Sequence, residues 1–288
     1  MARPADCYVC GVIEPSSHAP WWHRAFADVC ARIDLSTDPT ALERAATILS
    51  AHRSDLIETM ADVDMTMNHL DRIATEIERP EIDAWRRHLF IECGFAGNGN
   101  DYHDVRNSFL PDVIERRVGI PISLAIVAVA VARRIGLRAW GVGMPGHFLL
   151  GAVDGRAAAV YVDPFNGGEL LDPAACAALF AGMFGTVQPF EQRYLDETAS
   201  AAILIRMLAN LKANYARTRD LEGLAAVLRM RTSLPDSSLD EQRELIRLLD
   251  ATGSWTEADH ALTQIESLRP EDAMVLQLER DRLDARLN

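Results

Sequence analysis

Cysteine is scarce in this sequence. Its 288 residues contain five cysteines, which is too few for the disulfide scaffolds that stabilise small secreted domains. The opening residues Met1–Asp6 also lack the apolar segment of a secretory signal. We therefore expect a cytoplasmic protein whose thiols are reduced.

Long apolar runs and an excess of positive charge are also missing. The longest stretches without a formal charge are Val118–Ala132, Ala139–Val153 and Pro173–Phe190, all shorter than the roughly 20 residues of a membrane-spanning helix. The 29 basic residues are outnumbered by 42 acidic ones, for a net charge of −13, and such a chain repels phosphate backbones. The sequence therefore predicts neither a membrane nor a nucleic-acid partner. It also lacks a P-loop and a dinucleotide-binding glycine motif, so no cofactor is expected.

The N-terminal third is predicted to be an arm followed by helices. Residues 1–20 contain several prolines and serines without an apolar period, which is typical of a flexible arm. Apolar residues at steps of three and four then predict helices through residues 20–95. Cys7 and Cys10, followed by His18 and His23, form an alternative zinc site. Their spacing is shorter than in zinc fingers, so we expect a solvated arm and no metal.

The segment Gly119–Gly136 carries the strongest structural signal. Its residues are apolar on every side until Arg133, as in a fully buried helix. Pro121 suits the first helical position and Gly136 suits the position just after the last turn. Its valines and isoleucines are also compatible with a strand, but the run is too long for a typical buried strand. We therefore predict a buried helix.

Strands are predicted after this helix. Arg138–Met144, His147–Ala152 and Ala158–Val162 are short and apolar, and Asp154-Gly155 is a hairpin turn signal. A central helix followed by antiparallel strands defines an α+β domain. We place this domain, together with the N-terminal helical layer, at residues 21–195.

Residues 196–288 are predicted to be helical repeats. An offset of 34 residues aligns Leu211 with Leu245, Tyr215 with Leu249, and Leu228 with Leu262. This period is that of tetratricopeptide-type helix pairs. Helical repeats present concave surfaces to proteins and peptides, so a protein or peptide partner is expected to bind through this segment.

The middle of the chain resembles the transglutaminase-like superfamily, whose core is papain-like. Active members carry Gly-x-Cys-x-x-x-Ala at the start of the buried helix and Arg-x-x-Gly at its end, followed by a His on a hairpin and an Asp on the next strand. The matching residues here are Gly119, Ala125, Arg133, Gly136, His147 and Asp163. The phrases Phe95-Ala-Gly-Asn, Pro145-Gly-His-Phe-Leu and Asp163-Pro-Phe-Asn-Gly-Gly resemble the SirB-like bacterial branch, in which tetratricopeptide repeats follow the core.

The resemblance to active enzymes ends at the nucleophile. An ungapped match places Pro121 where active members have Cys, and proline has no nucleophilic atom. Ser123 lies about 200° further around the helix and is expected to point elsewhere. Cys93, a second substitute, precedes Gly94 at the end of a predicted helix, where the helix dipole raises the pKa of a thiol. We interpret Cys93 as a structural residue.

His147 and Asp163 are the candidate acid–base pair, and the hairpin register decides whether they meet. A three-residue loop sets His147 opposite Asp163, whereas a two-residue loop sets it opposite Val162. The pair is interpreted either as structural and vestigial or as a working acid–base pair. The polar residues predicted to line a cleft beside it, with Pro121, are Asn98, Asp101, Tyr102, Arg106 and Asn107.

Two functions follow from these residues. The first is a non-catalytic transglutaminase-like protein that binds partners through the vestigial cleft and the helical repeats. The alternative is a hydrolase or acyltransferase that uses His147 and Asp163 with a relocated nucleophile, Ser123 or Cys93.

Overall fold

The computed structural model describes residues 12–33, 38–53, 55–153, 158–185 and 188–287. Contacts divide the chain into two compact units. The central unit is Ile33–Met207, and the terminal unit joins Met1–Arg32 to Leu208–Asn288. The boundary falls within helix α8 (Ser200–Thr218). Residues 21–32, which were expected to belong with the core, are thus grouped with the C-terminal helices.

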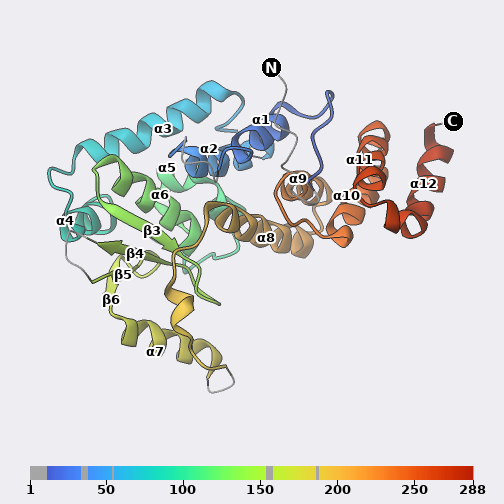
Figure 1. The fold of residues 1–288 in the computed structure, drawn as a ribbon. Coiled ribbons are helices and arrows are strands. Elements are labelled where there is room, and N and C mark those ends of the chain that lie inside the picture. The colour runs from blue at the N-terminus through green and yellow to red at the C-terminus, as the bar shows by residue number, and fades with distance from the viewer. Residues whose placement is uncertain (1–11, 34–37, 54, 154–157, 186–187, 288) are drawn as a thin grey trace. The chain divides into compact units, whose positions relative to one another are not determined.

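The central unit contains a helical layer and an antiparallel sheet (Figure 1). Its first half contains α2 (Ala41–Ile48), the short 3₁₀ helix Leu49–His52, α3 (Met60–Thr75), α4 (Ile82–Arg87), a π-helix (His88–Glu92), the 3₁₀ helix Val105–Ser108 and α5 (Leu110–Arg116). The four-stranded sheet has the order β3 (Arg138–Val142), β4 (Leu149–Val153), β5 (Val160–Asp163) and β6 (Glu169–Leu171). Helix α7 (Pro173–Phe184) and the 3₁₀ helix Gln192–Leu195 follow the sheet.

Helix α6 (Pro121–Arg134) lies at the centre of this unit and confirms the prediction of a buried helix. It packs on α3 and on strands β3 and β4 (Figure 1). Pro121 occupies its first turn, and Gly136 has the positive φ of 78° that ends a helix without a steric penalty. The Trp85 indole donates a hydrogen bond to the Ala128 carbonyl oxygen at 3.0 Å, which fixes α4 to α6 while satisfying a buried donor.

A second, two-residue ladder fixes the chain just before α6. Strand β1 (Ala96–Gly97) pairs in parallel with β2 (Val118–Gly119). Gly97 must be glycine because a Cβ there would lie 2.3 Å from the Phe165 ring. The residues after Phe95 are thereby held against both the start of α6 and the loop that follows β5.

The terminal unit consists of α1 (Trp21–Cys30), the end of α8, and helices α9 (Leu221–Thr232), α10 (Leu239–Ala251), α11 (Trp255–Leu268) and α12 (Ala273–Leu287), with a short 3₁₀ turn at Pro270–Asp272. Each helix from α9 to α12 contacts the next, and α1 packs on α9. The residues aligned by the 34-residue offset are all buried, namely Leu211, Tyr215, Leu228, Leu245, Leu249 and Leu262.

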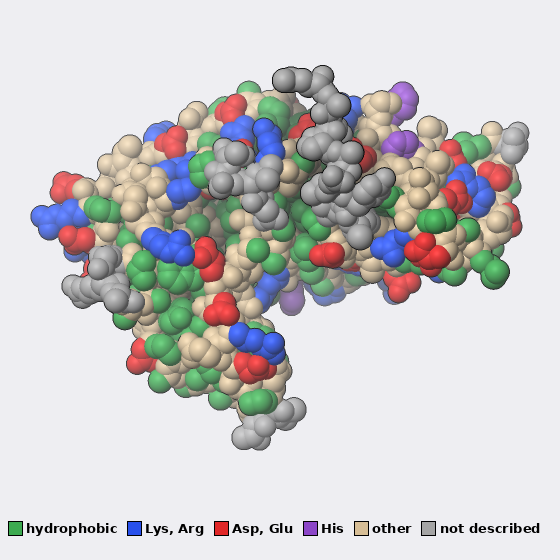
Figure 2. All heavy atoms as spheres, viewed as in Figure 1, with side chains coloured by type: hydrophobic (Ala, Val, Ile, Leu, Met, Phe, Trp, Pro, Cys, Tyr) green, Lys and Arg blue, Asp and Glu red, His purple; other side chains and the backbone are tan. Residues whose placement is uncertain are grey.

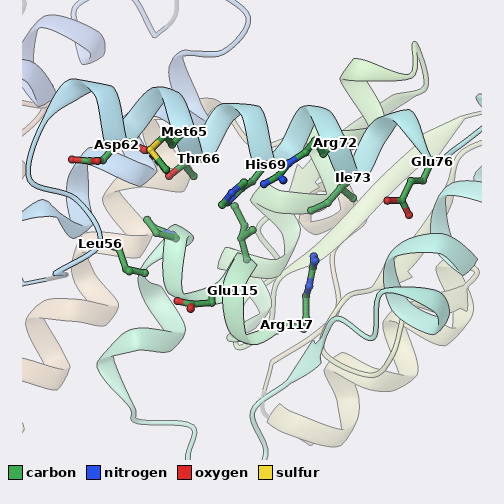
Figure 3. A pocket seen from close by; sticks show the side chains of 12 residues that line it. Leu56, Asp62, Met65, Thr66, His69, Arg72, Ile73, Glu76, Glu115 and Arg117 are labelled. Atoms are coloured by element: carbon green, nitrogen blue, oxygen red, sulfur yellow. Dashed lines mark hydrogen bonds between the residues drawn. The ribbon is translucent and has the colours of Figure 1, made fainter.

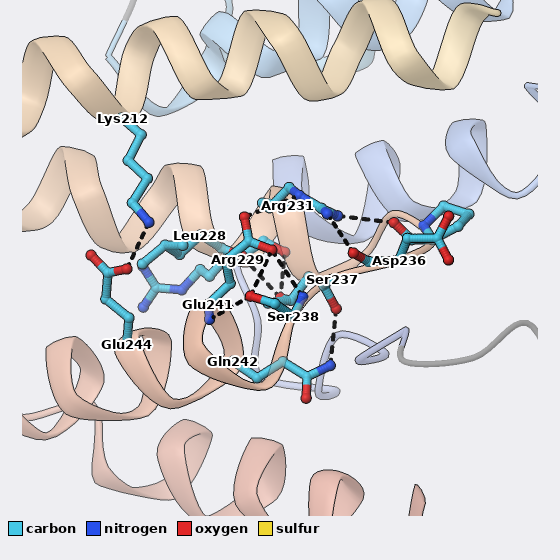
Figure 4. A network of polar contacts seen from close by, with 12 residues as sticks. Lys212, Leu228, Arg229, Arg231, Asp236, Ser237, Ser238, Glu241, Gln242 and Glu244 are labelled. Atoms are coloured by element: carbon cyan, nitrogen blue, oxygen red, sulfur yellow. Dashed lines mark hydrogen bonds and ion pairs between the residues drawn. The ribbon is translucent and has the colours of Figure 1, made fainter. Parts of the chain in front are cut away.

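The turn between α9 and α10 is held by one arginine (Figure 4). Arg231 donates hydrogen bonds to the carbonyl oxygens of Pro235 and Asp236 at 3.0 and 2.7 Å. Ser238 then caps α10, and Glu241 bonds back to its backbone NH at 3.0 Å. The guanidinium thus replaces the solvent that these carbonyl groups would otherwise require.

The described part of the predicted arm, residues 12–20, is anchored to the terminal unit. Ile13 is 3% exposed, and its NH donates to the Thr232 carbonyl oxygen at 2.8 Å. The Gln264 side chain bonds both the NH and the carbonyl oxygen of Glu14, each at 2.9 Å. This segment therefore differs from the flexible arm expected from its prolines, because one buried isoleucine and a bidentate amide fix it.

Candidate functional site

The N-terminus of α6 is built around Ser123. Ile120 is extended and Pro121 has no NH to satisfy, so the helix begins without losing a hydrogen bond. Ser123 is fully buried. Its hydroxyl accepts from the Ile120 NH at 3.2 Å and donates to the Asn107 carbonyl oxygen at 2.6 Å. The Ser123 hydroxyl is therefore used to cap the helix and hold the preceding loop.

Asn107 joins the predicted cleft residues into one network. Its side-chain NH₂ donates to the carbonyl oxygens of Asp101 and Tyr102 at 2.7 and 3.3 Å. Its side-chain oxygen accepts from Asn98 at 3.0 Å. Asn107 is fully buried, whereas Tyr102 is 46% exposed. The network thus fixes the backbone of the loop and leaves the tyrosine ring at the surface.

Arg106 does not join this network. It is exposed and forms a fork on the Asp104 carboxylate, with Nε and Nη2 at 3.1 and 2.8 Å. Its predicted place in a cleft remains a prediction.

The structure brings His147 and Asp163 together. His147 Nε2 lies 2.9 Å from Asp163 Oδ2. The other carboxylate oxygen accepts from the backbone NH groups of Phe165 and Asn166 at 2.9 and 3.2 Å, and the Asn166 side chain donates to Oδ2 at 2.8 Å. Asp163 is 1% exposed. Every lone pair that the carboxylate directs into the protein therefore has a donor.

The strand register that places this pair differs from both predicted registers. Leu150 pairs with Val162 and Ala152 with Val160, so continuing the ladder by one residue sets Asp163 opposite Leu149. His147 lies two residues before Leu149, on the same face, and its imidazole reaches Asp163 diagonally. The prediction of a direct cross-strand pair was wrong because it assumed a loop of two or three residues. The predicted turn at Asp154-Gly155 lies outside the described residues.

Neighbouring groups hold the pair in place. The Gly97 NH donates to the Phe165 carbonyl oxygen at 3.1 Å, and the Tyr102 and Phe165 rings lie 5.9 Å apart. Arg206 donates to the carbonyl oxygens of Met144 and His147 at 3.0 and 2.8 Å. The loop at 97–107, the start of α6 and the His147 turn therefore form one region, as the resemblance implies.

The surroundings of Asp163 favour its ionised form. Burial alone would raise the pKa of Asp163, but the hydrogen bond and charge of His147, together with the bonds from Asn166, lower it below its usual value. An ionised carboxylate only accepts hydrogen bonds, so His147 Nε2 carries the proton. In a neutral imidazole Nδ1 is then the basic nitrogen. Burial lowers the pKa of the Arg206 guanidinium, with Tyr102 opposing that effect.

Neither candidate nucleophile is bonded to His147. Among hydrogen bonds between described residues, none joins His147 to Ser123 or to Cys93. Cys93 Sγ lies 3.3 Å from His88 Nε2 instead. Reasoning from the sequence missed His88 because the two residues are five positions apart, a spacing that an α-helix does not bring together but a π-helix does.

A hollow of about 500 Å³ lies elsewhere in the central unit, between α3 and α5 (Figure 3). Leu56, Met65, Ile73 and Ile114 give it apolar walls. His69 and Arg117 point into it (Figure 3). Burial lowers the pKa of His69, as do the charges of Arg72 and Arg117.

Glu76 lines both this hollow and a second, more polar one of about 710 Å³ beside His88 and Glu92. Neither hollow is lined by His147.

The described residues contain no group of three or more His, Cys, Asp and Glu side chains that could hold a metal ion. Cys7 and Cys10 of the alternative zinc site lie outside them. His23 is buried, and its Nε2 lies 3.0 Å from the Ser233 hydroxyl.

A helix with the length and apolar composition needed to span a membrane is not found in the described ranges. Figure 2 shows acidic and basic side chains interspersed on the described part of one face.

The comparison with protein families agrees with this arrangement. Residues 51–209, more than half of the chain, match the family model described as the transglutaminase-like superfamily. This stretch holds α6, the sheet, and the His147–Asp163 pair. The chain therefore belongs to the transglutaminase-like superfamily.

Several curated proteins are similar in sequence to this chain. The chain is 32% identical over 237 residues to a UPF0162 protein of Xylella fastidiosa strain 9a5c, covering 76% of this chain and 83% of the relative. A UPF0162 protein of Vibrio cholerae is 31% identical over 140 residues, covering 49% and 52%. F-box only protein 21 of Mus musculus is 28% identical over 203 residues, covering 65% of this chain and 30% of that protein. No solved structure gives a significant match.

Proposed function

We propose that this protein is a binding module whose transglutaminase-like core does not catalyse acyl transfer at His147. The observation that carries the proposal is the start of α6, where Pro121 is the first helical residue and where the resemblance matches it to the nucleophile of active members. The hydroxyl nearest to that position in sequence, Ser123, is engaged with the Asn107 carbonyl oxygen at 2.6 Å. The His147–Asp163 pair then acts as a structural clamp that closes the loop after β5.

The C-terminal helices are the proposed contact for a protein or peptide partner, in the manner of the SirB-like branch with its tetratricopeptide repeats. Helix α12 buries Leu276 and Leu283 but leaves Met274 and Leu278 91% and 55% exposed. These two residues are one turn apart and share a helix face. Terminal helices of repeat proteins usually have a polar outer face, so this apolar face supports a contact with an apolar segment of a partner.

Activity assays test the catalytic half of the proposal. The full chain is incubated with amine and glutamine donors, peptides and esters, beside His147→Ala and the control His260→Ala, whose imidazole is exposed on α11. We expect no turnover that depends on His147. Turnover that His147→Ala abolishes and His260→Ala preserves would overturn the proposal and favour an acid–base role for the pair.

Affinity capture tests the binding half. The wild-type chain and a Leu278→Glu variant are used as baits in parallel, with Gln277→Glu as the control that adds the same charge next to the apolar face. We expect a partner retained by the wild type and by Gln277→Glu but lost with Leu278→Glu. Identical captures by all three baits contradict a contact through α12.

The alternative, a hydrolase or acyltransferase with a relocated nucleophile, is favoured by the intact pair, since His147 Nε2 and Asp163 Oδ2 lie 2.9 Å apart. It requires Ser123 or Cys93 to leave its present hydrogen bond. A cytoplasmic location is proposed with either function, and it is supported by the free thiols of Cys93 and Cys176.

A further inference from the structure

The π-helix at His88–Glu92 assembles three chemically complementary side chains away from the His147 pair. The Cys93 NH donates to the His88 carbonyl oxygen at 2.8 Å, which closes the wider turn of the π-helix. This turn places Cys93 Sγ 3.3 Å from His88 Nε2. Glu92 Oε2 lies 3.1 Å from Nδ1 of the same ring. Thiol, imidazole and carboxylate thus follow one another in a chain of hydrogen bonds.

The direction of these hydrogen bonds follows from the chemistry of the groups. An ionised glutamate only accepts, so His88 Nδ1 carries the proton that is shared with Glu92. In the neutral imidazole Nε2 is then an acceptor, and it faces the Cys93 S–H. This is the arrangement of a nucleophile, a general base and the group that orients the base. His88 has a side chain that is 7% exposed, so water does not compete strongly for Nε2.

The Cys93 thiol is protonated before it reacts. Burial raises the pKa of Cys93, Arg117 opposes this, and Glu76 and Glu92 add to the rise. Its proton must therefore leave during the attack, which is the task of an adjacent base. Cys93 is partly exposed, while Cys30 and Cys176 are buried, so among the described cysteines Cys93 is the most accessible to a reagent.

The hollow between α3 and α5 adjoins this cluster through Glu76, which lines the hollow and whose Oε2 lies 3.8 Å from His88 Nε2. Arg117 also lines the hollow, and the charges of both residues act on the pKa of Cys93. Figure 3 shows both residues at the same end as Ile73, with Met65 and Leu56 toward the other end. A volume of about 500 Å³ is within the range of small-ligand sites. The apolar walls suit a hydrocarbon chain whose carbonyl end faces the arginine.

We propose that Cys93 is a nucleophile, which accepts an aliphatic acyl group from an ester or thioester, with His88 as its base and Glu92 as a positioning residue. This proposal is independent of the His147 site. Sγ forms a bond to the carbonyl carbon while its proton passes to His88 Nε2. The bond from that carbon to the leaving oxygen or sulfur then breaks, and His88 returns the proton to the leaving group. One thiol and one ester become one thioester and one alcohol, with no change in oxidation state.

The experiment uses p-nitrophenyl octanoate as the acyl donor and the full chain with Cys7→Ser and Cys10→Ser, so that these cysteines do not react. We expect a burst of about one equivalent of nitrophenolate and an octanoyl group on the peptide that contains Cys93. Cys93→Ala removes both, whereas Cys176→Ala and His147→Gln change neither. His88→Gln lowers the burst rate at least tenfold, and Glu92→Gln shifts its pH profile.

Each result bears on a separate part of the proposal. A folded chain whose Cys93 stays unmodified, or a His88→Gln variant that acylates as fast as the parent, overturns it. An acetyl ester that reacts faster than the octanoyl ester refutes the role of the hollow. A burst that is lost with His147→Gln but retained with Cys93→Ala assigns the reaction to the His147 site and overturns the proposed function as well.

Discussion

Replacing Asp163 with asparagine tests the clamp that holds the His147 turn and the loop after β5. The carboxylate accepts from His147 Nε2, the Asn166 side chain, and the NH groups of Phe165 and Asn166. An asparagine keeps one acceptor oxygen and turns an NH₂ group toward two of these donors, whichever way it is oriented. Each buried donor left without an acceptor costs about 1–3 kcal/mol.

We therefore expect Asp163→Asn to lower the free energy of unfolding by about 3–4 kcal/mol. With a slope of about 2 kcal/mol per M urea, the unfolding midpoint falls by about 1.5–2 M. Circular dichroism or tryptophan fluorescence during urea titration measures this shift. The control is Asp83→Asn, whose side chain is 82% exposed and 3.8 Å from its Arg86 partner, and which should change stability by less than about 0.5 kcal/mol.

The pH dependence of the same variant adds a second check. The pKa of Asp163 is lowered in the folded protein, so its contribution is fully present above the unfolded pKa of about 3.9. It is lost as the pH falls below that value through the folded pKa. The difference in stability between the wild type and Asp163→Asn should therefore begin to shrink at about pH 4 and shrink further as the pH falls through the lowered pKa of Asp163. An Asp163→Asn variant as stable as the wild type at neutral pH would refute the clamp.

Three further outcomes follow from buried groups. Burial lowers the pKa of His23 from 6.5 to about 4. The free energy of unfolding of the terminal unit should therefore decrease by about 3 kcal/mol as the pH falls from about 6.5 to 4. His23→Gln should remove this pH dependence, so acid denaturation curves of the variant should be flatter in that range. Ser123→Ala should lower the free energy of unfolding, measured by urea titration, by only about 1 kcal/mol, because the Ile120 NH keeps its 3.3 Å hydrogen bond to the Asn107 carbonyl oxygen. A decrease of more than about 3 kcal/mol would contradict this. Leu262→Ala, at a fully buried position, should lower the free energy of unfolding measured by calorimetry by about 2–5 kcal/mol. An unchanged free energy of unfolding would place this residue outside the core.

Helix α6 shows what the sequence predicts well. Pro121 and Gly136 mark its two ends through local backbone rules that do not depend on the rest of the fold. Its uniform apolar composition leaves burial as the stable outcome, and the structure confirms both the type and the bounds of the element. The coarse position of His147 and Asp163 follows from the same kind of evidence, because His147 lies just before the short strand β4 and Asp163 ends the short strand β5.

What the sequence did not predict depends on single-residue spacing. The hairpin register requires the length of the connection between β4 and β5, and one residue more or fewer changes every pair. The meeting of His88 and Cys93 requires a π-turn, which the usual periods of two and 3.6 residues do not reveal. Ile13 belongs to the short apolar pair Val12-Ile13 before Pro15, and it gives no periodic signal although it is buried.

The π-turn also makes the contact between Cys93 and His88 depend on a single residue of chain length. A π-turn holds one residue more than an α-turn with the same ends, so deleting a single codon between His88 and Cys93 would restore a regular helix there. The fold would keep its hydrogen-bonded backbone, but sulfur and imidazole would no longer face each other. Length variation at this one point among relatives would therefore separate chains that retain the thiol–imidazole contact from chains that have lost it.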